Sequence, residues 1–525
     1  MNDCRNHFQS IFSLLEHAKR LFPNKEAAID DSRRLSYKQL YEESVAIASG
    51  LTLSGIGLND KVIVCLPNRS EFISIFFALE AVGAVMIPCN PSCRKKEWDD
   101  IFSHITVKAV FCAQNAENIG YFFNKKQEGK LDLLVGVNFR SNYAPSLDEF
   151  MQLKCSRKVT LCAVDGHADQ TTIILFTSGS TGIPKGVMLT ARNLLFSAAN
   201  VAEHLRCTPN DVFFVPVPFF HIFGLVPGIL TSILSCGKIV TVHAFHAEEA
   251  LGIIDHEKIT VHYGVPTMFI LEMNHPDLSK TNFQSLRTGL IAGSPCPTAI
   301  MKKIESHMHC LLIASYGATE TSGGVSFTCF QDSSNHRYQS VGRVVANTKI
   351  KIVDEQQKEV PVGTIGELIC SGQGVMKGYL NDVTDSLLRG EWFHTGDLAK
   401  IDERGYLYIV GRKKDMIIRG GYNIYPAELE GLYHSHPIIA EVSVVGLPDT
   451  VLGEVICAVI QLKPAYQTTE ITETSLKDYL RNKVASCKIP DHIFFIDQFP
   501  LNAAGKINKA VLRERCMREL KTVLR

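Results

Sequence analysis

In the first 340 residues, apolar positions follow two patterns that alternate along the chain. Segments 8–21, 37–53 and 71–82 carry apolar residues at the three- and four-residue spacing of a helix. Short, almost continuous apolar runs lie between and after them, as in strands that are buried on both faces. This alternation predicts an α/β layer fold with a largely parallel sheet. The predicted strands are 62–66, 84–88, 172–176, 239–242, 289–292 and 311–314.

The pattern changes after about residue 340. Short apolar runs at 349–353, 366–370 and 406–410 are separated by Gly, Asp and Glu turns, which is typical of antiparallel β structure. A basic, glycine-containing stretch follows, and beyond it helix and strand patterns alternate over a short length. We therefore predict two domains. A large N-terminal domain, residues 1–411, combines α/β layers with an antiparallel β subdomain, and a small mobile α+β domain spans residues 412–525.

Composition excludes several classes of protein. The 525 residues are 46% hydrophobic and 21% charged, as in an ordinary soluble globular protein and unlike a disordered chain. Lys plus Arg and Asp plus Glu both number 54, and this balance argues against nucleic acid as a main partner. The 16 cysteines show no Cys-x-x-Cys spacing, which favours buried free thiols in a reducing cytosol.

Two long apolar stretches, 72–88 and 213–240, raise the question of a membrane span. The first is short and contains Glu80, and the second is interrupted by prolines, His221 and Lys238. A span needs about 20 uninterrupted apolar residues, so we predict no transmembrane segment, while a peripheral membrane contact stays open. Neither terminus carries a targeting or lipidation signal, and the expected location is the cytoplasm.

The strongest local signal is Thr177-Ser-Gly-Ser-Thr-Gly-Ile-Pro-Lys-Gly186, directly after a predicted strand. Its glycines let the backbone approach an anion, and successive N–H groups can surround phosphate oxygens. It is not a Walker A loop, because Pro184 precedes Lys185 and Gly186 follows it. The groups expected to contact a phosphate are Thr177, Ser178, Gly179, Ser180, Thr181, Gly182 and Lys185.

Five further motifs follow in order, and together with this loop they resemble the adenylate-forming (ANL) superfamily over nearly the whole chain. That family includes acyl-CoA synthetases, nonribosomal peptide adenylation domains and firefly luciferase. One departure is Gly411 before Arg412, where many relatives have Asp, although other acyl-CoA ligases also have Gly there. The motifs are Tyr316-Gly-Ala-Thr-Glu320, His394-Thr-Gly-Asp397, Tyr408-Ile-Val-Gly-Arg-Lys-Lys-Asp415, Gly420-Gly-Tyr-Asn-Ile-Tyr-Pro-Ala-Glu428 and Asn502-Ala-Ala-Gly-Lys506.

The resemblance implies a reaction in two halves that uses ATP, Mg²⁺ and coenzyme A. A carboxylate attacks the α-phosphate of ATP to give acyl-AMP and pyrophosphate, and a thiol then takes the acyl group and releases AMP. Such chemistry depends on positioning and charge neutralisation. Thr181 and Lys185, with Ser178, are therefore expected to hold the β- and γ-phosphates, and Glu320 to bind Mg²⁺, which prefers oxygen ligands.

By the same resemblance, two short segments after strands and two polar side chains recognise AMP. Tyr316 is expected to stack on adenine, and Asp397 to accept hydrogen bonds from both ribose hydroxyls, since an ionised carboxylate only accepts. Arg412 is expected to donate to the ribose or a phosphate. The full set of expected contacts is Gly293, Ser294, Pro295, Ser315, Tyr316, Gly317, Thr319, Asp397 and Arg412.

The remaining catalytic roles lie near the hinge and the acyl pocket. Lys506 is expected to bind the bridging oxygen of the α-phosphate, and Lys414 to be the hinge of the small domain. Rotation there would exchange Lys506 for the loop at Gly420 and Gly421, whose glycines leave room for the pantetheine arm. His221 is expected beside the substrate carboxylate.

The expected acyl-pocket wall favours an uncharged acid. It comprises His221–Leu225, Tyr263–Met268 and Ser322–Ser326, which carry no evident charge, with Gly324 as a point where a side chain could fill the pocket. The predicted substrate is therefore a medium- or long-chain fatty acid. An aryl acid, as in 4-coumarate-type ligases, and a stand-alone enzyme that loads a separate carrier protein stay open, as does the oligomeric state.

Two further alternatives carry less support. A luciferase-like oxygenase would need a light or oxygen-uptake assay to be tested. A non-enzymatic nucleotide-binding or scaffold protein is disfavoured by the intact Lys506, Glu320 and Asp397.

Overall fold

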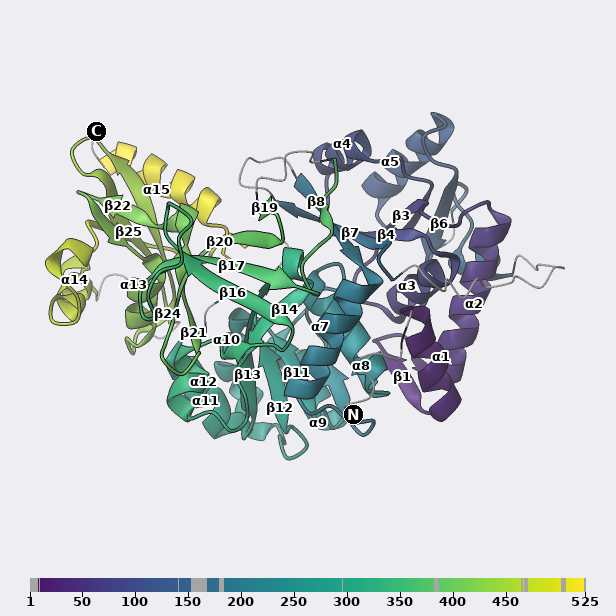
Figure 1. Ribbon diagram of the computed structural model, residues 1–525, viewed down its shortest axis with the longest axis horizontal. Coiled ribbons are helices and arrows are strands. Elements are labelled where there is room, and N and C mark those ends of the chain that lie inside the picture. The colour runs from purple at the N-terminus through teal and green to yellow at the C-terminus, as the bar shows by residue number, and fades with distance from the viewer. Residues whose placement is uncertain are drawn as a thin grey trace.

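The structure, a computed structural model, describes residues 8, 10–139, 141–152, 168–178, 184–294, 296–381, 387–463, 466, 471–501 and 507–523. Within these ranges the strands form four sheets, three before Lys413 and one after Met416 (Figure 1). The predicted fold class is confirmed: α/β layers, an antiparallel β subdomain and a small α+β unit follow one another along the chain.

The first sheet has seven strands, of which β7, β4, β3, β5 and β6 are parallel neighbours. The apolar runs of β3, β4 and β7 predicted buried parallel strands, whereas β5 and β6 were not predicted. Strands β8 and β18 extend one edge in antiparallel fashion. In sheet order the strands are β18 (Gly378–Tyr379), β8 (Pro184–Thr190), β7 (Thr171–Ser178), β4 (Val85–Pro88), β3 (Lys61–Cys65), β5 (Ala109–Ala113) and β6 (Leu133–Val137).

The second sheet has nine strands with a parallel centre, strand β2 antiparallel to β1 at one edge and an antiparallel pair at the other. That pair, β14 and β15, turns back along β13 and leads toward the third sheet. In sheet order the strands are β15 (Arg343–Val344), β14 (Gly323–Phe327), β13 (Leu311–Ala318), β12 (Thr288–Ile291), β11 (Val261–Gly264), β9 (Val212–Phe214), β10 (Lys238–Val240), β1 (Glu26–Ile29) and β2 (Arg34–Ser36).

The largest hydrophobic core lies between these two sheets and includes residues of both. Helix α3 (Ser70–Val82) is buried at every position from Ser70 to Leu79, because packing covers it on all sides, and it ends at Gly83, whose φ of 72° only glycine adopts readily. Helix α2 (Tyr37–Leu53) begins at Ser36, whose hydroxyl accepts from the Gln39 N–H at 3.2 Å.

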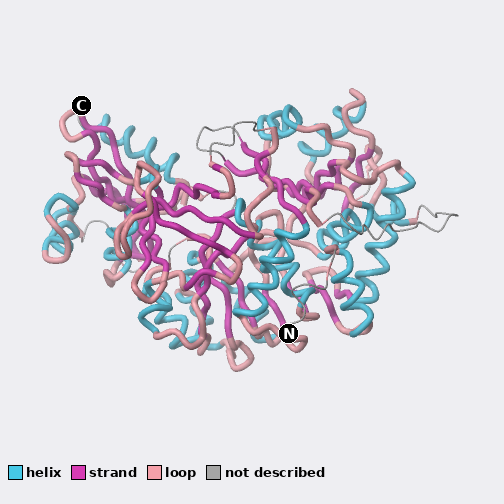
Figure 2. The backbone as a smooth tube through the Cα atoms, viewed as in Figure 1, coloured by secondary structure: helices cyan, strands magenta, loops and turns pink. Residues whose placement is uncertain are grey.

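Helices cover both faces of the two sheets, as Figures 1 and 2 show. One stretch is a π-helix, η2, which follows His221 and contains Pro227. The remaining helices of this part are α1 (Phe12–Leu21), α4 (Lys95–His104), α5 (Ala116–Gln127), α6 (Leu147–Met151), α7 (Ala191–His204), η2 (Gly224–Leu230), α8 (Thr231–Leu234), α9 (Ala247–His256), α10 (Pro266–Met273), η3 (Pro276–Lys280), α11 (Thr298–Met308), η4 (Thr319–Thr321) and α12 (Ser334–Gln339).

The third sheet is antiparallel throughout, as the short runs after residue 340 predict. Its strands are β16 (Thr348–Val353), β17 (Gly366–Gly372), β20 (Trp392–Ile401) and β19 (Leu388–Arg389), with β21 (Leu407–Arg412) also paired to β20. A short 3₁₀ turn, η5 (Lys413–Asp415), then leads to the fourth sheet. The predicted boundary near residue 411 falls at this change of sheet, and mobility there stays a prediction.

The fourth sheet lies at one end of the molecule, drawn green to yellow in Figure 1. Its strands are β23 (Tyr422–Ile424), β22 (Ile417–Arg419), β25 (Gly453–Leu462) and β24 (Ile439–Asp449), with β26 (His492–Phe495) paired to β25. The helices of this unit are α13 (Pro426–His434), α14 (Glu473–Arg481), η7 (Ser486–Lys488) and α15 (Lys509–Val523).

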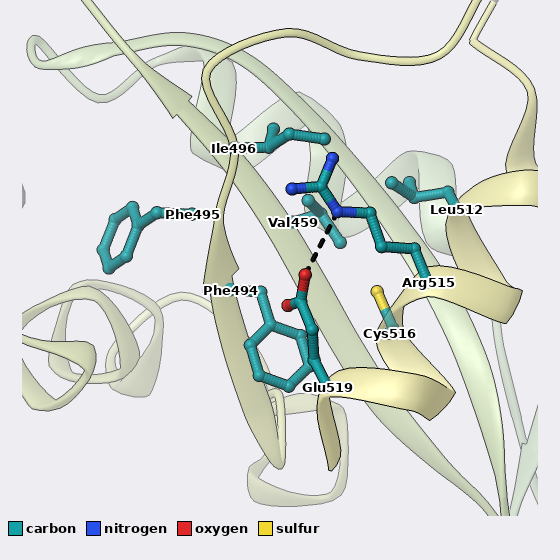
Figure 3. A pocket seen from close by; sticks show the side chains of 8 residues that line it. All are labelled: Val459, Phe494, Phe495, Ile496, Leu512, Arg515, Cys516 and Glu519. Atoms are coloured by element: carbon teal, nitrogen blue, oxygen red, sulfur yellow. Dashed lines mark hydrogen bonds and ion pairs between the residues drawn. The ribbon is translucent and has the colours of Figure 1, made fainter. Parts of the chain in front are cut away.

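A small pocket lies under α15 in this C-terminal unit (Figure 3). Cys516 and Leu512 reach it from the helix, Val459 and Phe494 from the sheet, and the Arg515–Glu519 ion pair lies on the helix beside it. All of its lining residues belong to the C-terminal unit, so it is a packing feature of that unit rather than part of a site shared with the large domain.

Across the ranges that the structure describes, every helix is either too short or too polar to span a membrane. The apolar stretch 213–240 folds as β9, η2, α8 and β10, and η2 is buried at every position. This segment is therefore core of the large domain, as its interrupted pattern predicts.

Candidate active site

The predicted phosphate loop connects two antiparallel strands, β7 and β8. Thr177 pairs with Lys185 and Ser178 with Pro184 in the register of this hairpin. The Thr177 hydroxyl donates to the Lys185 carbonyl oxygen at 3.5 Å, which ties the two ends together. Of the residues expected to bind phosphate, Gly179, Ser180, Thr181 and Gly182 lie outside the described residues, and Ser178 is placed by its backbone alone.

Lys185 and Glu320, expected at the phosphates and at Mg²⁺, meet at a common side chain. The Lys185 ammonium lies 4.8 Å from the centre of the Tyr379 ring. The Tyr379 hydroxyl donates a hydrogen bond of 2.9 Å to Glu320 Oε1. Because Tyr379 lies on β18 beside β8, and Glu320 lies in η4 after β13, this contact joins the first sheet to the second.

The residues at Glu320 suit a Mg²⁺ ion that is held mainly by phosphates. Among the residues that the structure describes, no group of three or more His, Cys, Asp or Glu side chains could hold a metal. Mg²⁺ keeps much of its water and typically binds one or two carboxylates together with substrate phosphates. A single carboxylate facing the phosphate hairpin fits that pattern, and Glu320 would be this ligand.

Tyr316, Asp397 and Arg412 form one polar group where the second and third sheets meet. The Tyr316 hydroxyl donates to Asp397 Oδ2 at 2.6 Å, and Arg412 forms an ion pair with Asp397, with Nε 3.1 Å from Oδ1. Asp397 and Arg412 are register partners on β20 and β21. Asp397 is only 5% exposed, so its two partners compensate for burying the carboxylate.

The electrostatics of this group follow from burial and from the Asp397 charge. Burial raises the pKa of Tyr316 well above its ordinary value, and the nearby Asp397 carboxylate raises it further. Tyr316 therefore stays protonated and can keep donating to Asp397 at any physiological pH. This bond holds the hydroxyl end of Tyr316 in place beside Asp397.

The glycine- and serine-containing segments expected to contact AMP lie at the carboxyl ends of two parallel neighbours, β12 and β13. Gly293, with φ of 94°, and Ser294 are exposed just beyond β12, and Pro295 lies outside the described residues. Gly317 follows a bulge in β13, and a Cβ there would lie 1.7 Å from the Gly323 carbonyl oxygen. Open α/β sheets present ligands at such strand ends.

Two more of the expected nucleotide contacts lie on either side of Tyr316. Ser315, in β13, is 9% exposed, and Thr319 begins the η4 turn that carries Glu320. The structure thus brings Ser315, Tyr316, Gly317, Thr319 and Glu320 onto one strand end. Their contact with a nucleotide stays a prediction.

His221 lies at the entrance to the π-helix η2. Its N–H donates to the Pro218 carbonyl oxygen at 3.1 Å, and its own carbonyl accepts from the Leu225 N–H at 3.0 Å. Gly224 is required here, since a Cβ would lie 2.2 Å from the Pro218 oxygen. π-helical turns often occur at functional sites, which agrees with a position for His221 at the acyl pocket.

The expected wall of the acyl pocket is apolar, with one correction. Tyr263 is fully buried, and its ring centre lies 6.1 Å from that of Phe223. Gly324, however, leaves no free volume, because a Cβ there would lie 2.1 Å from the Phe327 ring and 2.9 Å from Ser315 Oγ. The prediction that a side chain at Gly324 would enter an open pocket is therefore wrong.

The hinge and the glycine loop are both at the surface. Lys414 is exposed within η5, and its neighbour Lys413 donates to Glu367 Oε2 at 3.3 Å. Gly420 and Gly421 form the turn between β22 and β23 with φ of 56° and 85°, values that favour glycine. No heavy atom lies within 4 Å of a Cβ built at Gly421. Lys506 lies outside the described residues.

Tyr379 was not among the residues that the sequence singles out. It stands in Val375-Met-Lys-Gly-Tyr379, where glycine and lysine interrupt the apolar pattern and no residue carries a chemical signal. Only the pairing of β18 with β8 places it between Lys185 and Glu320. No spacing rule predicts such a long-range contact.

Comparison with known proteins agrees with this arrangement. Residues 15–380 match the family described as AMP-binding enzyme, and residues 428–506 match the family described as AMP-binding enzyme C-terminal domain. The chain is 35% identical to YngI of Bacillus subtilis (strain 168), whose name proposes an acyl-CoA synthetase, over 96% of this chain and 97% of that protein.

Two further relatives extend the comparison. The medium-chain acyl-CoA ligase ACSF2, mitochondrial, of Rattus norvegicus is 33% identical over 98% of this chain and 88% of its own length. The crystal structure of the ATP-bound RpMatB-BxBclM chimera B1 superimposes with a TM-score of 0.87 at 28% identity, covering 97% of this chain and 98% of that one.

Proposed function

The chain belongs to the AMP-binding enzyme family and is an AMP-forming acyl-CoA ligase, and we propose that it activates a medium- or long-chain fatty acid. The observation that supports this choice of acid is the apolar character of the segment after His221, which is the expected wall of the acyl pocket. The η2 helix is buried and apolar throughout, and Tyr263 and Phe223 pack beside it. Burying a second, unpaired charge against such a wall costs several kcal/mol.

The named relatives support the same class of acid. ACSF2 of Rattus norvegicus is a medium-chain acyl-CoA ligase by name, and it aligns with this chain over nearly its whole length. An uncharged acyl tail is the feature that the wall and this relative share. We therefore infer that this chain accepts medium-chain acids, and the longest acyl chain that it accepts can be measured.

In the first half-reaction, the polar group around Asp397 holds AMP and the hairpin holds the departing pyrophosphate. Asp397 accepts from the ribose, Tyr316 lies against adenine, and Lys185 neutralises phosphate charge. Glu320 would hold Mg²⁺, which neutralises charge on the phosphates when bound. His221 orients the acid so that its carboxylate oxygen faces the α-phosphate.

In the second half-reaction, the C-terminal unit turns a different surface toward the active site. Lys506 serves the attack on the α-phosphate, and a rotation at Lys414 replaces it with the Gly420–Gly421 turn. In the structure both glycines of this turn are exposed, and a Cβ built at Gly421 would meet no heavy atom within 4 Å. The thiol of coenzyme A then attacks the acyl carbon, the bond to AMP breaks, and AMP leaves with the oxygen.

A panel of acids scored by pyrophosphate release tests the proposal. Each buried methylene contributes about 0.8 kcal/mol, so kcat/KM should climb roughly fourfold per carbon until the pocket is full. Dicarboxylates and amino acids should be poor substrates. A wild type that prefers acetate, malonate or a cinnamic acid would overturn the assignment of the acid, while CoA-dependent release of AMP separates a ligase from an enzyme that loads a carrier protein.

A further inference from the structure

Tyr379 lies between the two charged groups that are expected to handle the phosphates of ATP. Its hydroxyl donates to Glu320 Oε1 at 2.9 Å, and the Lys185 ammonium lies 4.8 Å from its ring centre. The side chain is 4% exposed, so both contacts are shielded from bulk water. A buried aromatic ring attracts a cation more strongly than an exposed one, and a hydrogen bond to a carboxylate is stronger than one between neutral groups.

The backbone around Tyr379 is bonded to the same two elements. The Leu380 N–H donates to the Gly186 carbonyl oxygen at 2.7 Å, next to Lys185 in β8. The Met376 N–H donates to the Glu320 carbonyl oxygen, also at 2.7 Å. The segment from Met376 to Leu380 therefore holds the end of the phosphate hairpin and the η4 turn at a constant separation.

We propose that Tyr379 is a positioning residue for the adenylation half-reaction, acting on Glu320 through its hydroxyl and on Lys185 through its ring. The inference rests on the roles proposed above for Lys185 and Glu320. By binding Oε1, the hydroxyl fixes the rotation of the Glu320 carboxylate, which would hold Mg²⁺ when the ion is bound. The ring attracts the Lys185 ammonium and so holds it close to the phosphate hairpin.

Tyr379→Phe separates the two contacts, because it removes only the hydroxyl and keeps the ring under Lys185. Loss of the partner of a metal-binding side chain typically lowers metal affinity about 10- to 100-fold. We expect the Mg²⁺ concentration for half-maximal pyrophosphate exchange to rise roughly tenfold. KM for ATP at saturating Mg²⁺ should stay within about twofold of wild type, since the ring remains.

Tyr379→Leu removes both contacts and should raise KM for ATP even at saturating Mg²⁺. A direct binding measurement complements the kinetics: electron paramagnetic resonance of Mn²⁺ with a non-hydrolysable ATP analogue should show weaker Mn²⁺ binding in both variants. Because this measurement needs no acid and no turnover, it tests Tyr379 even if the proposed fatty-acid substrate is wrong.

Tyr406→Phe is a matched control. Tyr406 is also buried, at 3% exposure, and its hydroxyl also donates to a carboxylate, Asp332 Oδ1, at 2.6 Å, but it lies outside the site. This variant should keep the wild-type Mg²⁺ dependence. Equal changes in Tyr379→Phe and Tyr406→Phe would show a general loss of stability and overturn the positioning role.

A double-mutant cycle with Glu320→Gln decides whether Tyr379 acts through Glu320. If it does, Tyr379→Phe should add little to the Mg²⁺ defect of Glu320→Gln. Additive defects, or a wild-type Mn²⁺ affinity in folded Tyr379→Phe, would overturn the proposal. Acyl-CoA formation from supplied acyl-AMP, which bypasses ATP, should be unaffected in Tyr379→Phe, and failure of the wild type in that assay would count against the proposed function instead.

Discussion

At the scale of single residues, substitution of Asp397 would remove a buried carboxylate together with the contacts of both its oxygens. Both of its carboxylate oxygens have a partner in the structure: one accepts a hydrogen bond from Tyr316, and the other lies in an ion pair with Arg412. A bound ribose would add to or replace these bonds without leaving the carboxylate unpaired. If Asp397 binds the ribose as proposed, its carboxylate is already held in place by Tyr316 and Arg412.

We expect Asp397→Ala to lower kcat/KM for ATP by roughly 10- to 150-fold, because a hydrogen bond to a charged group contributes about 1.5–3 kcal/mol. Steady-state kinetics with varied ATP and fixed acid measure this. The folded state should be checked by thermal unfolding, since Tyr316 and Arg412 lose their partner. An ATP profile like that of wild type would exclude Asp397 from the nucleotide site.

Asp30 is a structural carboxylate for which a pH dependence can be derived. Burial raises the pKa of Asp30, but hydrogen bonds from Ser32 and Ser70 outweigh that effect and lower it to about 2. A carboxyl group whose pKa falls on folding stabilises the folded state above its unfolded pKa, near 3.8, and loses that contribution as pH falls toward 2. The Asp30 carboxylate accepts from the Ser32 and Ser70 N–H groups and thereby connects the β1–β2 turn to the start of α3.

We therefore expect Asp30→Asn to unfold at a lower temperature than wild type at pH 7, by the equivalent of about 1–2 kcal/mol. The difference should shrink between about pH 4 and pH 2. Thermal unfolding at several pH values measures it, with the exposed Asp132→Asn as a control whose difference from wild type stays small. A stability difference between wild type and Asp30→Asn that grows as the pH falls would contradict the lowered pKa of Asp30.

The site residues that the sequence predicted are those that belong to short contiguous motifs. Tyr316, Asp397 and Arg412 come from three separate motifs, and the structure brings them into direct contact. Tyr379 was missed and Gly324 was misjudged for one reason: both depend on which side chain arrives from another strand. Residue type and spacing carry no information about such long-range packing.

At the scale of elements, β11 and α10 are joined by a buried pair that the motifs do not reveal. His262 Nε2 hydrogen-bonds to both Glu272 carboxylate oxygens, at 2.9 and 3.1 Å, and both side chains are fully buried. The His262 ring lies between Phe214 and Phe269, with ring centres at 5.2 and 4.7 Å. The pair thus fixes α10, which begins within the expected acyl-pocket wall, to its preceding strand.

Glu272→Ala should destabilise the large domain by about 3 kcal/mol, because it leaves a buried imidazole without its partner. The double variant His262→Phe with Glu272→Leu should recover part of this loss, since apolar residues of similar size need no hydrogen bond. Thermal or denaturant unfolding gives the comparison, with exposed Glu248→Ala as the control. If Glu272→Ala were as stable as Glu248→Ala, the His262–Glu272 pair would not be needed to stabilise the large domain.

The Gly420–Gly421 turn gives the second prediction at this scale. A Cβ at Gly421 meets no atom within 4 Å, but its φ of 85° is unfavourable for any other residue. Gly421→Leu should therefore fold with a small loss of stability, keep pyrophosphate exchange and make less acyl-CoA, because the side chain would obstruct the thiol when the turn docks. Loss of exchange in a stable protein would show that the turn is not dedicated to the second half-reaction.

Element prediction succeeded where an apolar pattern was long and closed by turn signals. The helix 37–53 matches α2, and the strand 84–88 differs from β4 by one residue. The short strands β8 and β18 were not predicted, because glycine, proline and lysine break their apolar patterns. The π-helix η2 was also missed, since its all-apolar sequence shows no period, and packing on every side determines its form.

At the scale of the whole molecule, the site is assembled from three sheets. The first supplies Lys185 and Tyr379, the second Tyr316 and Glu320, and the third Asp397. The sequence predicted the kinds of layers but not the order of the strands in them, because strand order depends on crossovers whose partners lie far apart in sequence. The fourth sheet forms the C-terminal unit, which is expected to bring Lys506 or the Gly420–Gly421 turn to the site.

This division of labour leads to the last prediction, which concerns Lys506. If the C-terminal unit supplies one group to each half-reaction, Lys506→Ala should abolish acyl-AMP formation from ATP and acid. The same variant should largely keep acyl-CoA formation from supplied acyl-AMP, since the Gly420–Gly421 turn is intact. Gly421→Leu should show the opposite pattern, so the two variants together test the exchange of faces at Lys414. Equal loss of both half-reactions in folded Lys506→Ala would mean that this lysine supports the site as a whole, and that the two faces of the unit do not act in turn.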